Sequence, residues 1–329
     1  MLKNNPPKKI AGIGSALMDV LAYENDDFLE KTGGAKGGMM LVDLPFMDMA
    51  LATTRNGTTT VPGGSACNTT VGIAKLGGLS RFIGKCGKDE LAALFEEALR
   101  TNGVEPHLFK SASPTGRVLS IITPDAQRSM FTFLGASSEL TVDEVAASEF
   151  SDVAIVHVEG YLLFNEELIY AAVKCAKNAG ALISLDLASY TIVEASRDIL
   201  EDIVERYVDI LIGNEDEVRA FTGRNDEEAA IASLARKADI AVLKVGARGS
   251  YIARDADIVK IEPVTGLGEV VDTTGAGDLW ASGFLFGMVN GFPLEKCGVL
   301  GSACGYEVCR VVGANIPDEG WNRIRARIK

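Results

Sequence analysis

Residues 272–286 read DTTGAGDLWASGFLF, a run of small and polar residues that leads directly into an apolar segment. The run predicts a tight turn followed by the first turn of a helix. Gly275, Ala276 and Gly277 leave the backbone uncovered, so their N–H groups can point outward together with the positive end of the helix dipole. We therefore expect an anion to bind at this junction.

A carboxylate, Asp278, ends this run of small residues. Beside an anion held by backbone amides, it is suited to take a proton from an alcohol while the amides stabilise charge on a transferring phosphoryl group. The alternative is that Asp278 only caps the helix and that the glycines only form the turn. A cap needs a single acidic or hydroxyl residue and no uncovered backbone, which favours the catalytic interpretation.

Several other motifs precede this one along the chain. They are Gly63-Gly64-Ser65-Ala66-Cys67-Asn68, Leu76-Gly77, Gly84-Lys85-Cys86-Gly87-Lys88-Asp89-Glu90, Gly213-Asn214-Glu215-Asp216-Glu217 and Lys244-Val245-Gly246-Ala247-Arg248-Gly249. Together with residues 272–278, and in this order, they resemble the ribokinase-like (PfkB) carbohydrate and nucleoside kinases over residues 8–318. The resemblance implies an ATP-dependent kinase with Asp278 as the base, and with the amides of Gly275, Ala276 and Gly277 around the phosphoryl group.

Hydrophobic periodicity predicts alternating strands and helices. Strands are expected at 9–13, 153–158, 181–186, 210–213 and 240–245, and helices at 67–76, 90–101, 166–179, 196–206, 215–222 and 226–237. Such alternation requires right-handed crossovers and a mainly parallel central sheet covered by helices on both faces. We predict one ribokinase-like α/β domain over residues 1–329, with ligands bound beyond the carboxyl ends of the strands.

Two regions interrupt this alternation, at about residues 15–60 and 112–136. Short apolar pieces at 17–22 and 39–43, and a hairpin formed by 118–123 and 129–134, predict a small separate sheet. The resemblance implies that this sheet is a lid that closes over the acceptor and excludes water. The alternative is a set of peripheral strands with no gating role.

The predicted acceptor site consists of Asp19, the turn Gly63-Gly64 and Asn68. A carboxylate and a carboxamide can bind the vicinal hydroxyls of a sugar, and glycines let its ring approach the backbone. The resemblance assigns these roles to Asp19, Gly64 and Asn68. Phe131 and Phe133 alternate along the predicted hairpin and so share one face; we expect them either to stack on a base, with Phe133 as a substrate contact, or to pack in a core.

On the nucleotide side, Asn214 and Glu217 lie three residues apart at the start of a predicted helix and therefore share a face. The resemblance assigns this pair to ATP and Mg²⁺, with Glu217 acting on the metal through water. The alternative is a helix cap, Asn214, with an acidic first turn. The resemblance also assigns four residues to ATP binding, namely Lys244, Gly246, Gly249 and Thr273. The alternative for Lys244 is a side chain that extends from the end of a strand to keep its charge in water.

The resemblance further implies a site for a monovalent cation, K⁺, built from Asp272, the Thr274 carbonyl oxygen and the turn near Gly313. Residues 308–312 depart from the small residues often found at such a site.

Composition narrows the class of protein. The 329 residues carry a formal net charge of −13 without a long basic run, which argues against a nucleic acid or an anionic membrane as partner. The six cysteines form no metal-binding pattern and are expected to be reduced thiols. The polar segment Met1–Lys9 and the lack of a long apolar run predict neither a signal peptide nor a membrane span, and hence a cytoplasmic protein.

Two weaker patterns point elsewhere. Gly12-Ile13-Gly14 begins like a dinucleotide-binding fingerprint, but Leu17 stands where the third glycine belongs. His107 and His157 are the only histidines, and we expect core or surface roles for them.

The acceptor is predicted from two further segments. The order Arg128-Ser129-Met130-Phe131-Thr132-Phe133-Leu134-Gly135, with Val158-Glu159-Gly160-Tyr161, most resembles the adenosine-kinase-like branch. We therefore predict transfer of the γ-phosphoryl group of ATP to the primary hydroxyl of an adenosine-like nucleoside, by a monomer or by a homodimer formed through the lid. The alternative is a sugar kinase acting on ribose, fructose or a keto-deoxy sugar acid, and a remote one is a regulator that binds nucleotide or sugar without catalysis.

Overall fold

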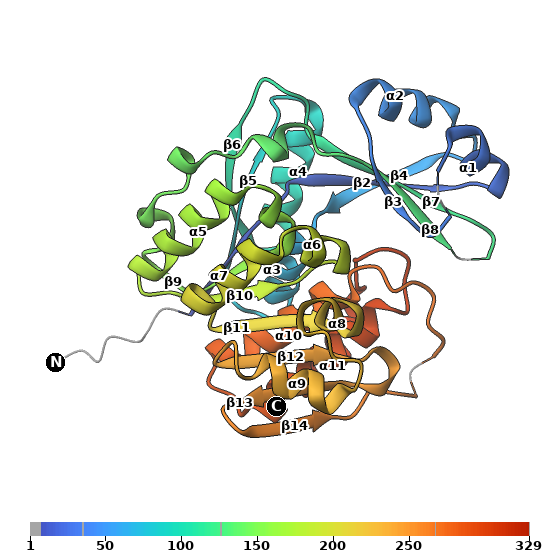
Figure 1. Cartoon of the computed structure of the whole chain (residues 1–329). Helices are drawn as coiled ribbons and strands as arrows, with labels where there is room; N and C mark the ends of the chain where they lie inside the picture. Colours follow the sequence, from blue (N-terminus) through green and yellow to red (C-terminus); the bar gives the residue numbers. More distant parts are fainter. Residues whose placement is uncertain (1–7, 35, 126, 267, 329) are drawn as a thin grey trace.

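The computed structural model describes residues 8–34, 36–125, 127–266 and 268–328. Its centre is a nine-stranded sheet in the order β14-β13-β12-β11-β10-β9-β1-β5-β6, in which only β13 runs opposite to the other strands (Figure 1). The strand bounds are β1 (Lys9–Ile13), β5 (Ser80–Cys86), β6 (Val104–Lys110), β9 (Val153–Glu159), β10 (Leu182–Asp186), β11 (Ile210–Asn214), β12 (Ile240–Lys244), β13 (Ser250–Arg254) and β14 (Asp257–Ile261).

Helices cover both faces of this sheet. On one face, α3, α4, α10 and α11 bury apolar residues of the strands, and on the other α5, α6, α7, α8 and α9 do so. The bounds are α3 (Ser65–Lys75), α4 (Glu90–Thr101), α5 (Glu166–Asn178), α6 (Tyr190–Ala195), α7 (Arg197–Tyr207), α8 (Glu215–Thr222), α9 (Glu227–Leu234), α10 (Ala276–Val289), α11 (Leu294–Val308) and α12 (Asp318–Ala326), which packs outside α11. The predicted α/β class with a doubly covered, mainly parallel sheet is confirmed.

A second sheet has the strand order β3-β8-β7-β2-β4 and lies to the side of the first one, at the upper right of Figure 1. The helices α1 and α2 pack on one face of it. The bounds are β2 (Leu17–Tyr23), β3 (Met39–Leu41), β4 (Thr58–Gly63), β7 (Gly116–Ile122), β8 (Arg128–Phe133), α1 (Asp26–Thr32) and α2 (Leu44–Thr53). The predicted hairpin is the antiparallel pair β7 and β8, although Ala126 in its turn lies outside the described residues.

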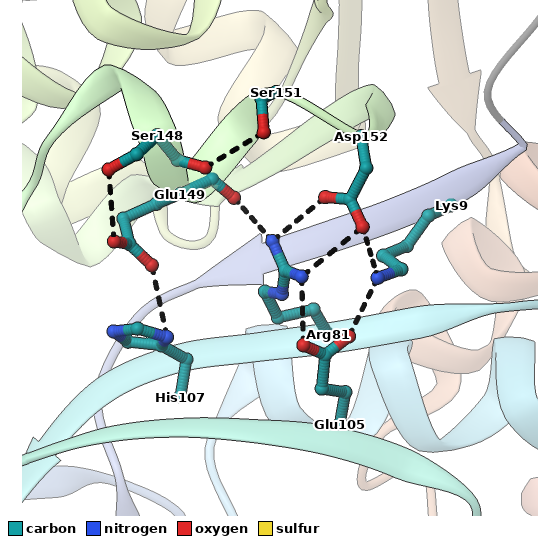
Figure 2. A network of polar contacts seen from close by, with 8 residues as sticks. All are labelled: Lys9, Arg81, Glu105, His107, Ser148, Glu149, Ser151 and Asp152. Atoms are coloured by element: carbon teal, nitrogen blue, oxygen red, sulfur yellow. Dashed lines mark hydrogen bonds and ion pairs between the residues drawn. The ribbon is translucent and has the colours of Figure 1, made fainter.

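A network of charged side chains joins the amino ends of four neighbouring strands (Figure 2). Arg81 of β5 donates to Glu105 of β6 at 2.8 Å and to Asp152, just before β9, at 3.0 Å. Lys9, at the start of β1, pairs with the same two carboxylates. Because ligands bind at the opposite, carboxyl ends of parallel strands, this network serves the fold and lies away from the expected site.

The described part of the chain contains no helix that is both long and apolar enough to cross a membrane. All six cysteines are free thiols, as predicted. His157 is buried in β9, also as expected, and burial lowers its pKa to about 4.

Candidate active site

Asp278 lies where two helices begin. It is the third residue of α10, which follows Gly275 in a left-handed conformation with φ 72°. Its carboxylate accepts hydrogen bonds from the Ser65 hydroxyl at 2.7 Å and from the Asn68 side-chain amide at 2.9 Å, both in the first turn of α3. Asp278 is thus held by a neighbouring helix rather than serving as the cap of its own.

The electrostatic surroundings favour Asp278 as a base. Burial raises the pKa of Asp278 above its ordinary value, while the hydrogen bonds from Asn68 and Ser65 act to lower it. As a whole residue, Asp278 nevertheless keeps part of its surface accessible. The amino ends of α3 and α10 both place positive backbone dipole beside this carboxylate and any anion next to it.

The three small residues before Asp278 are not equivalent. The Ala276 N–H donates to the Thr273 carbonyl oxygen at 3.1 Å. The Gly277 N–H, in the second position of the helix, has no acceptor among the described residues. Gly275 is fixed by its positive φ and by Ala314, which a Cβ at this position would approach to 2.7 Å. Among the described residues, the Gly275 N–H also has no acceptor, so the turn of α10 presents the Gly275 and Gly277 amides, but not that of Ala276, to an anion.

Gly63 and Gly64 precede α3, and each position requires glycine for a different structural reason. Gly64 has φ 98°, and a Cβ on it would lie 2.4 Å from the Ser15 carbonyl oxygen, so only glycine fits. A Cβ on Gly63 would lie 2.5 Å from the carboxyl carbon of Asp19. The two glycines thus allow β4, the start of α3 and Asp19 to lie close together.

Asp19 projects from β2 and is linked to the rest of the site by Arg128. The Arg128 guanidinium lies 3.6 Å from the Asp19 carboxylate, donates to the Ser120 hydroxyl at 2.6 Å and also donates to the hydroxyl of Thr274. Burial raises the pKa of Asp19 to about 6, Arg128 acts to lower it and Asp278 acts to raise it. Arg128 therefore joins the small sheet to the loop before α10, a role that sequence reasoning missed.

Glu159, at the end of β9, is a second residue that sequence reasoning missed. Its carboxylate is almost completely buried and accepts the Ser15 N–H at 2.8 Å and the Ala66 N–H at 3.1 Å. Burial raises the pKa of Glu159 to about 7. A Cβ on Gly14 would lie 2.2 Å from this carboxylate, which explains one glycine of the apparent fingerprint; Gly12 makes room for α3.

On the nucleotide side, Asn214 and Glu217 form a complete capping box at the start of α8. The Asn214 side chain accepts the Glu217 N–H at 3.0 Å, and Glu217 accepts the Asn214 backbone N–H and side-chain amide, each at 2.7 Å. Burial, followed by the charge of Asp186, raises the pKa of Glu217 to about 7. The helix-cap alternative therefore describes the local contacts, and the predicted action on Mg²⁺ stays a prediction.

The remaining predicted nucleotide residues lie at the ends of β12 and α10. Gly246 and Gly249 turn the chain from β12 to β13 with φ 56° and 94°. Thr273 is exposed in the loop before α10. Lys244 ends β12, and its ammonium lies 2.9 Å from the Asp186 carboxylate.

Asp272 links two loops at the amino end of α10. Its carboxylate accepts the Thr274 N–H at 2.9 Å, the Thr274 hydroxyl at 2.7 Å and the Gly313 N–H at 2.8 Å. The predicted K⁺ site remains a prediction. Among the described residues, no group of three or more His, Cys, Asp or Glu side chains could hold a metal ion.

The expectation that Phe133 contacts the substrate needs correction. Register places Asp19, Val118 and Thr132 on one face of the small sheet, and Phe131 on the other. Phe133 shares the face of Phe131, as alternation requires, but α1 and α2 cover that face; Phe131 is buried in the core beneath them, and Phe133 packs against this core and is partly buried. Phe133 is therefore left out of the site proposed below.

The raised pKa of Asp19 leads to a testable pH dependence. Because the folded value of about 6 exceeds the ordinary 3.8, the protonated carboxyl stabilises the folded enzyme at low pH, and this contribution is lost as the pH rises through 6. A pKa difference of this size corresponds to about 3 kcal/mol as an upper bound. We therefore expect Asp19→Asn to stabilise the unliganded enzyme at pH 8, by about 1–3 kcal/mol, and much less at pH 4.5.

Thermal or denaturant unfolding of wild type and Asp19→Asn at both pH values checks this expectation. The lowered pKa of His157 gives a contribution to stability with the opposite pH dependence. This contribution is the same in both proteins, so it cancels in the comparison. A stability difference that does not grow with pH would contradict the electrostatic account of Asp19.

Comparisons with known proteins agree with this geometry. The model of the family described as pfkB family carbohydrate kinase matches residues 39–320. The crystal structure of adenosine kinase from Sinorhizobium meliloti superposes with a TM-score of 0.89 at 31% identity, covering 98% of this chain and 100% of that one. A probable sugar kinase from Rhizobium etli gives 0.90 at 30% identity and 98% coverage of both chains. A nucleoside kinase from Methanocaldococcus jannaschii is 28% identical over 81% of this chain and 85% of its own.

Proposed function

Because this chain belongs to the pfkB family of carbohydrate kinases, we propose that it transfers the γ-phosphoryl group of ATP to the primary hydroxyl of an adenosine-like nucleoside. The observation that carries the proposal is the position of Asp278, partly accessible and oriented by Ser65 and Asn68 beside the first turn of α10. An acceptor hydroxyl near this carboxylate is next to amides suited to an incoming phosphoryl group.

In the proposed reaction, Asp278 takes the proton of the acceptor hydroxyl as its oxygen attacks the γ-phosphorus. The Gly277 N–H is oriented toward the transferred group, and Ser65 and Asn68 hold the base in place. Asp19 binds the acceptor's ring hydroxyls from the small sheet, and Arg128 positions Asp19. Closure of the small sheet over the acceptor would exclude water and so limit hydrolysis of ATP.

A magnesium ion fits this site only when the nucleotide brings most of its ligands. Glu217 is nearly buried and already accepts two hydrogen bonds from Asn214. It would act on Mg²⁺ through water, and the ion would supply neutralisation of the phosphate charge. Asp272 with the Thr274 carbonyl oxygen stays our candidate for K⁺.

An apolar surface next to Asp19 supports a nucleoside. Leu21, Val118 and Met130 share the face of Asp19 on the small sheet. Tyr161 directly follows Gly160, just after the end of β9, and burial and then the carboxylates of Glu159 and Asp278 raise the pKa of its phenol. We propose that Tyr161, in place of Phe133, contacts the base.

A free sugar is the second candidate acceptor. It is favoured by the hydrogen-bonding groups around the acceptor, with Asp19 and Asn68 close to Asp278, and by the similarity to a probable sugar kinase. A keto-deoxy sugar acid is the least favoured sugar, because the carboxylates of Asp19 and Asp278 would repel its own carboxylate and the guanidinium of Arg128 is already paired with Asp19.

We also propose that the protein acts in the cytoplasm, where ATP is supplied. A homodimer through the small sheet stays a prediction; its motivating observation is that Met39 and Leu41 are exposed on the edge strand β3.

A panel of acceptors tests the proposal. Purified enzyme with ATP and Mg²⁺ is supplied with adenosine, other nucleosides, ribose, fructose or a keto-deoxy sugar acid, and ADP and the phosphorylated product are both measured. Adenosine is expected to give the highest kcat/KM, and 5′-deoxyadenosine, which lacks the acceptor hydroxyl, is expected to inhibit without reacting. A free sugar with kcat/KM tenfold above that of every nucleoside would replace our proposal with the sugar kinase.

A further inference from the structure

Lys244 lies directly beneath the first turn of α10. Its side chain is 13% exposed, and its ammonium lies 2.9 Å from the Asp186 carboxylate at the end of β10. A Cβ on Gly277 would be only 3.0 Å from the same nitrogen atom. The missing side chain of Gly277 therefore lets a full positive charge lie against the backbone that is oriented toward the phosphoryl group.

The charges that surround this ammonium are mostly negative. Asp186 of β10, Glu217 of α8 and Asp278 of α10 act on it, and the buried His157 of β9 lies nearby as a neutral ring. Burial acts to lower the pKa of Lys244, yet the carboxylates of Asp186 and Glu217 hold that pKa above its ordinary value. Lys244 thus stays charged, with Asp186 as its ion-pair partner.

Asp186 is held in place by an unusual turn. Ala188, two residues later, has φ 62°, a left-handed conformation that costs free energy for a residue other than glycine. In this turn the Ala188 N–H donates to one oxygen of Asp186 at 2.9 Å, which leaves the other oxygen for Lys244. Backbone strain at this point fixes a carboxylate that serves the ammonium.

We propose that Lys244 is a catalytic residue that exchanges partners: it pairs with Asp186 in the unliganded enzyme and contacts the transferred phosphoryl group during the reaction. Asp186 is the positioning residue to which the ammonium returns. The inference rests on the proposed kinase function and assigns the charge that acts from below the amides of α10. The bond from γ-phosphorus to ADP breaks, the bond to the acceptor oxygen forms, and the proton goes to Asp278 as before.

A set of variants separates this role from that of a structural ion pair. Lys244→Met alone leaves the buried Asp186 carboxylate without its positive partner and lowers the melting temperature under either account. In Lys244→Met/Asp186→Asn both charges are gone, and the asparagine oxygen still accepts the Ala188 N–H. Lys177→Met removes an ion pair with Asp209, at 2.7 Å, at the opposite, amino ends of the strands and serves as the control.

For the double variant we expect a melting temperature close to that of wild type and a kcat about 100-fold lower, the scale of one lost oxyanion contact. By calorimetry, a non-hydrolysable ATP analogue should bind about tenfold more weakly, whereas ADP and acceptor affinities change less than twofold. Lys177→Met should keep its kcat per folded molecule.

A double variant with kcat within threefold of wild type would overturn the proposal and leave Lys244 as a structural partner of Asp186. Equal weakening of ADP and of the ATP analogue would also overturn it, because a contact to the transferred group cannot act on ADP. If wild type phosphorylates no acceptor, the proposed function fails, and the two nucleotide affinities still decide the role of Lys244.

Discussion

Asp278→Asn is expected to lower kcat by about three orders of magnitude while leaving the fold intact, the scale expected when a general base is removed. The reason is chemical. An amide cannot take the proton of the acceptor hydroxyl, but it has nearly the volume of the carboxylate. Acceptor and ATP affinities should therefore change little, and the loss should appear in kcat.

The hydrogen bonds around Asp278 explain why the variant should still fold. The asparagine oxygen can accept from the Asn68 amide, and its NH₂ group can donate to the Ser65 hydroxyl, which rotates to accept. Removing a partly buried negative charge with a raised pKa also relieves a cost of folding. The melting temperature at pH 8 should consequently equal or exceed that of wild type.

Steady-state kinetics, binding calorimetry and thermal unfolding of the same preparations measure these effects. Asp198→Asn, which removes an exposed carboxylate in the first turn of α7, is the matched control and should keep full activity. Activity of Asp278→Asn within tenfold of wild type would mean that another group takes the proton.

Features that depend on neighbours in sequence could be predicted. The helices α4 and α8 begin and end at the predicted residues, because each starts at a local cap: Asp89 accepts the Ala92 N–H, and Asn214 forms its box with Glu217. The strands β9 to β12 were predicted because burial on both faces makes them continuous apolar runs.

Elements without such local signals were not predicted. The strand β5 is completely buried, yet it contains Arg81, Gly84 and Lys85, whose burial depends on partners from distant segments. The strands β4, β6, β13 and β14 and the helices α1, α2, α6, α11 and α12 were also missed. The error on Phe133 follows directly, because alternation shows which residues share a face, whereas α1 and α2 decide which face is covered.

The same limit applies to the site. Asp278 stands in a dense local motif, but Arg128, Glu159 and Asp186 each gain their surroundings from segments far away in the chain, such as Thr274 for Arg128. A single charged residue near the end of a strand is usually a surface residue, so sequence spacing alone cannot select these three. Their burial and their partners in the folded chain do distinguish these three residues from surface residues.

The second large effect is expected for substitutions at the acceptor site, at Asp19 and at the neighbouring Gly63. Asp19→Ala is expected to lower kcat/KM for the acceptor by about 100- to 1000-fold, because two hydrogen bonds from hydroxyls to a carboxylate contribute about 3–4 kcal/mol together. The KM for ATP should change less than threefold. Gly63→Ala places a Cβ 2.5 Å from the Asp19 carboxyl carbon and must displace that carboxylate, so an acceptor-specific loss of at least tenfold is expected.

A double-mutant cycle tests whether Gly63 acts through Asp19. If the only effect of the added methyl group is to displace the carboxylate, Gly63→Ala should cost nothing further in a protein that already carries Asp19→Ala. Thr60→Ala, on the opposite face of the same strand, is the control and should leave acceptor kinetics unchanged. Additive losses in the double variant would show that Gly63 serves the backbone of β4 rather than the position of Asp19. In the Asp19→Ala protein no carboxylate remains for the added methyl group to displace.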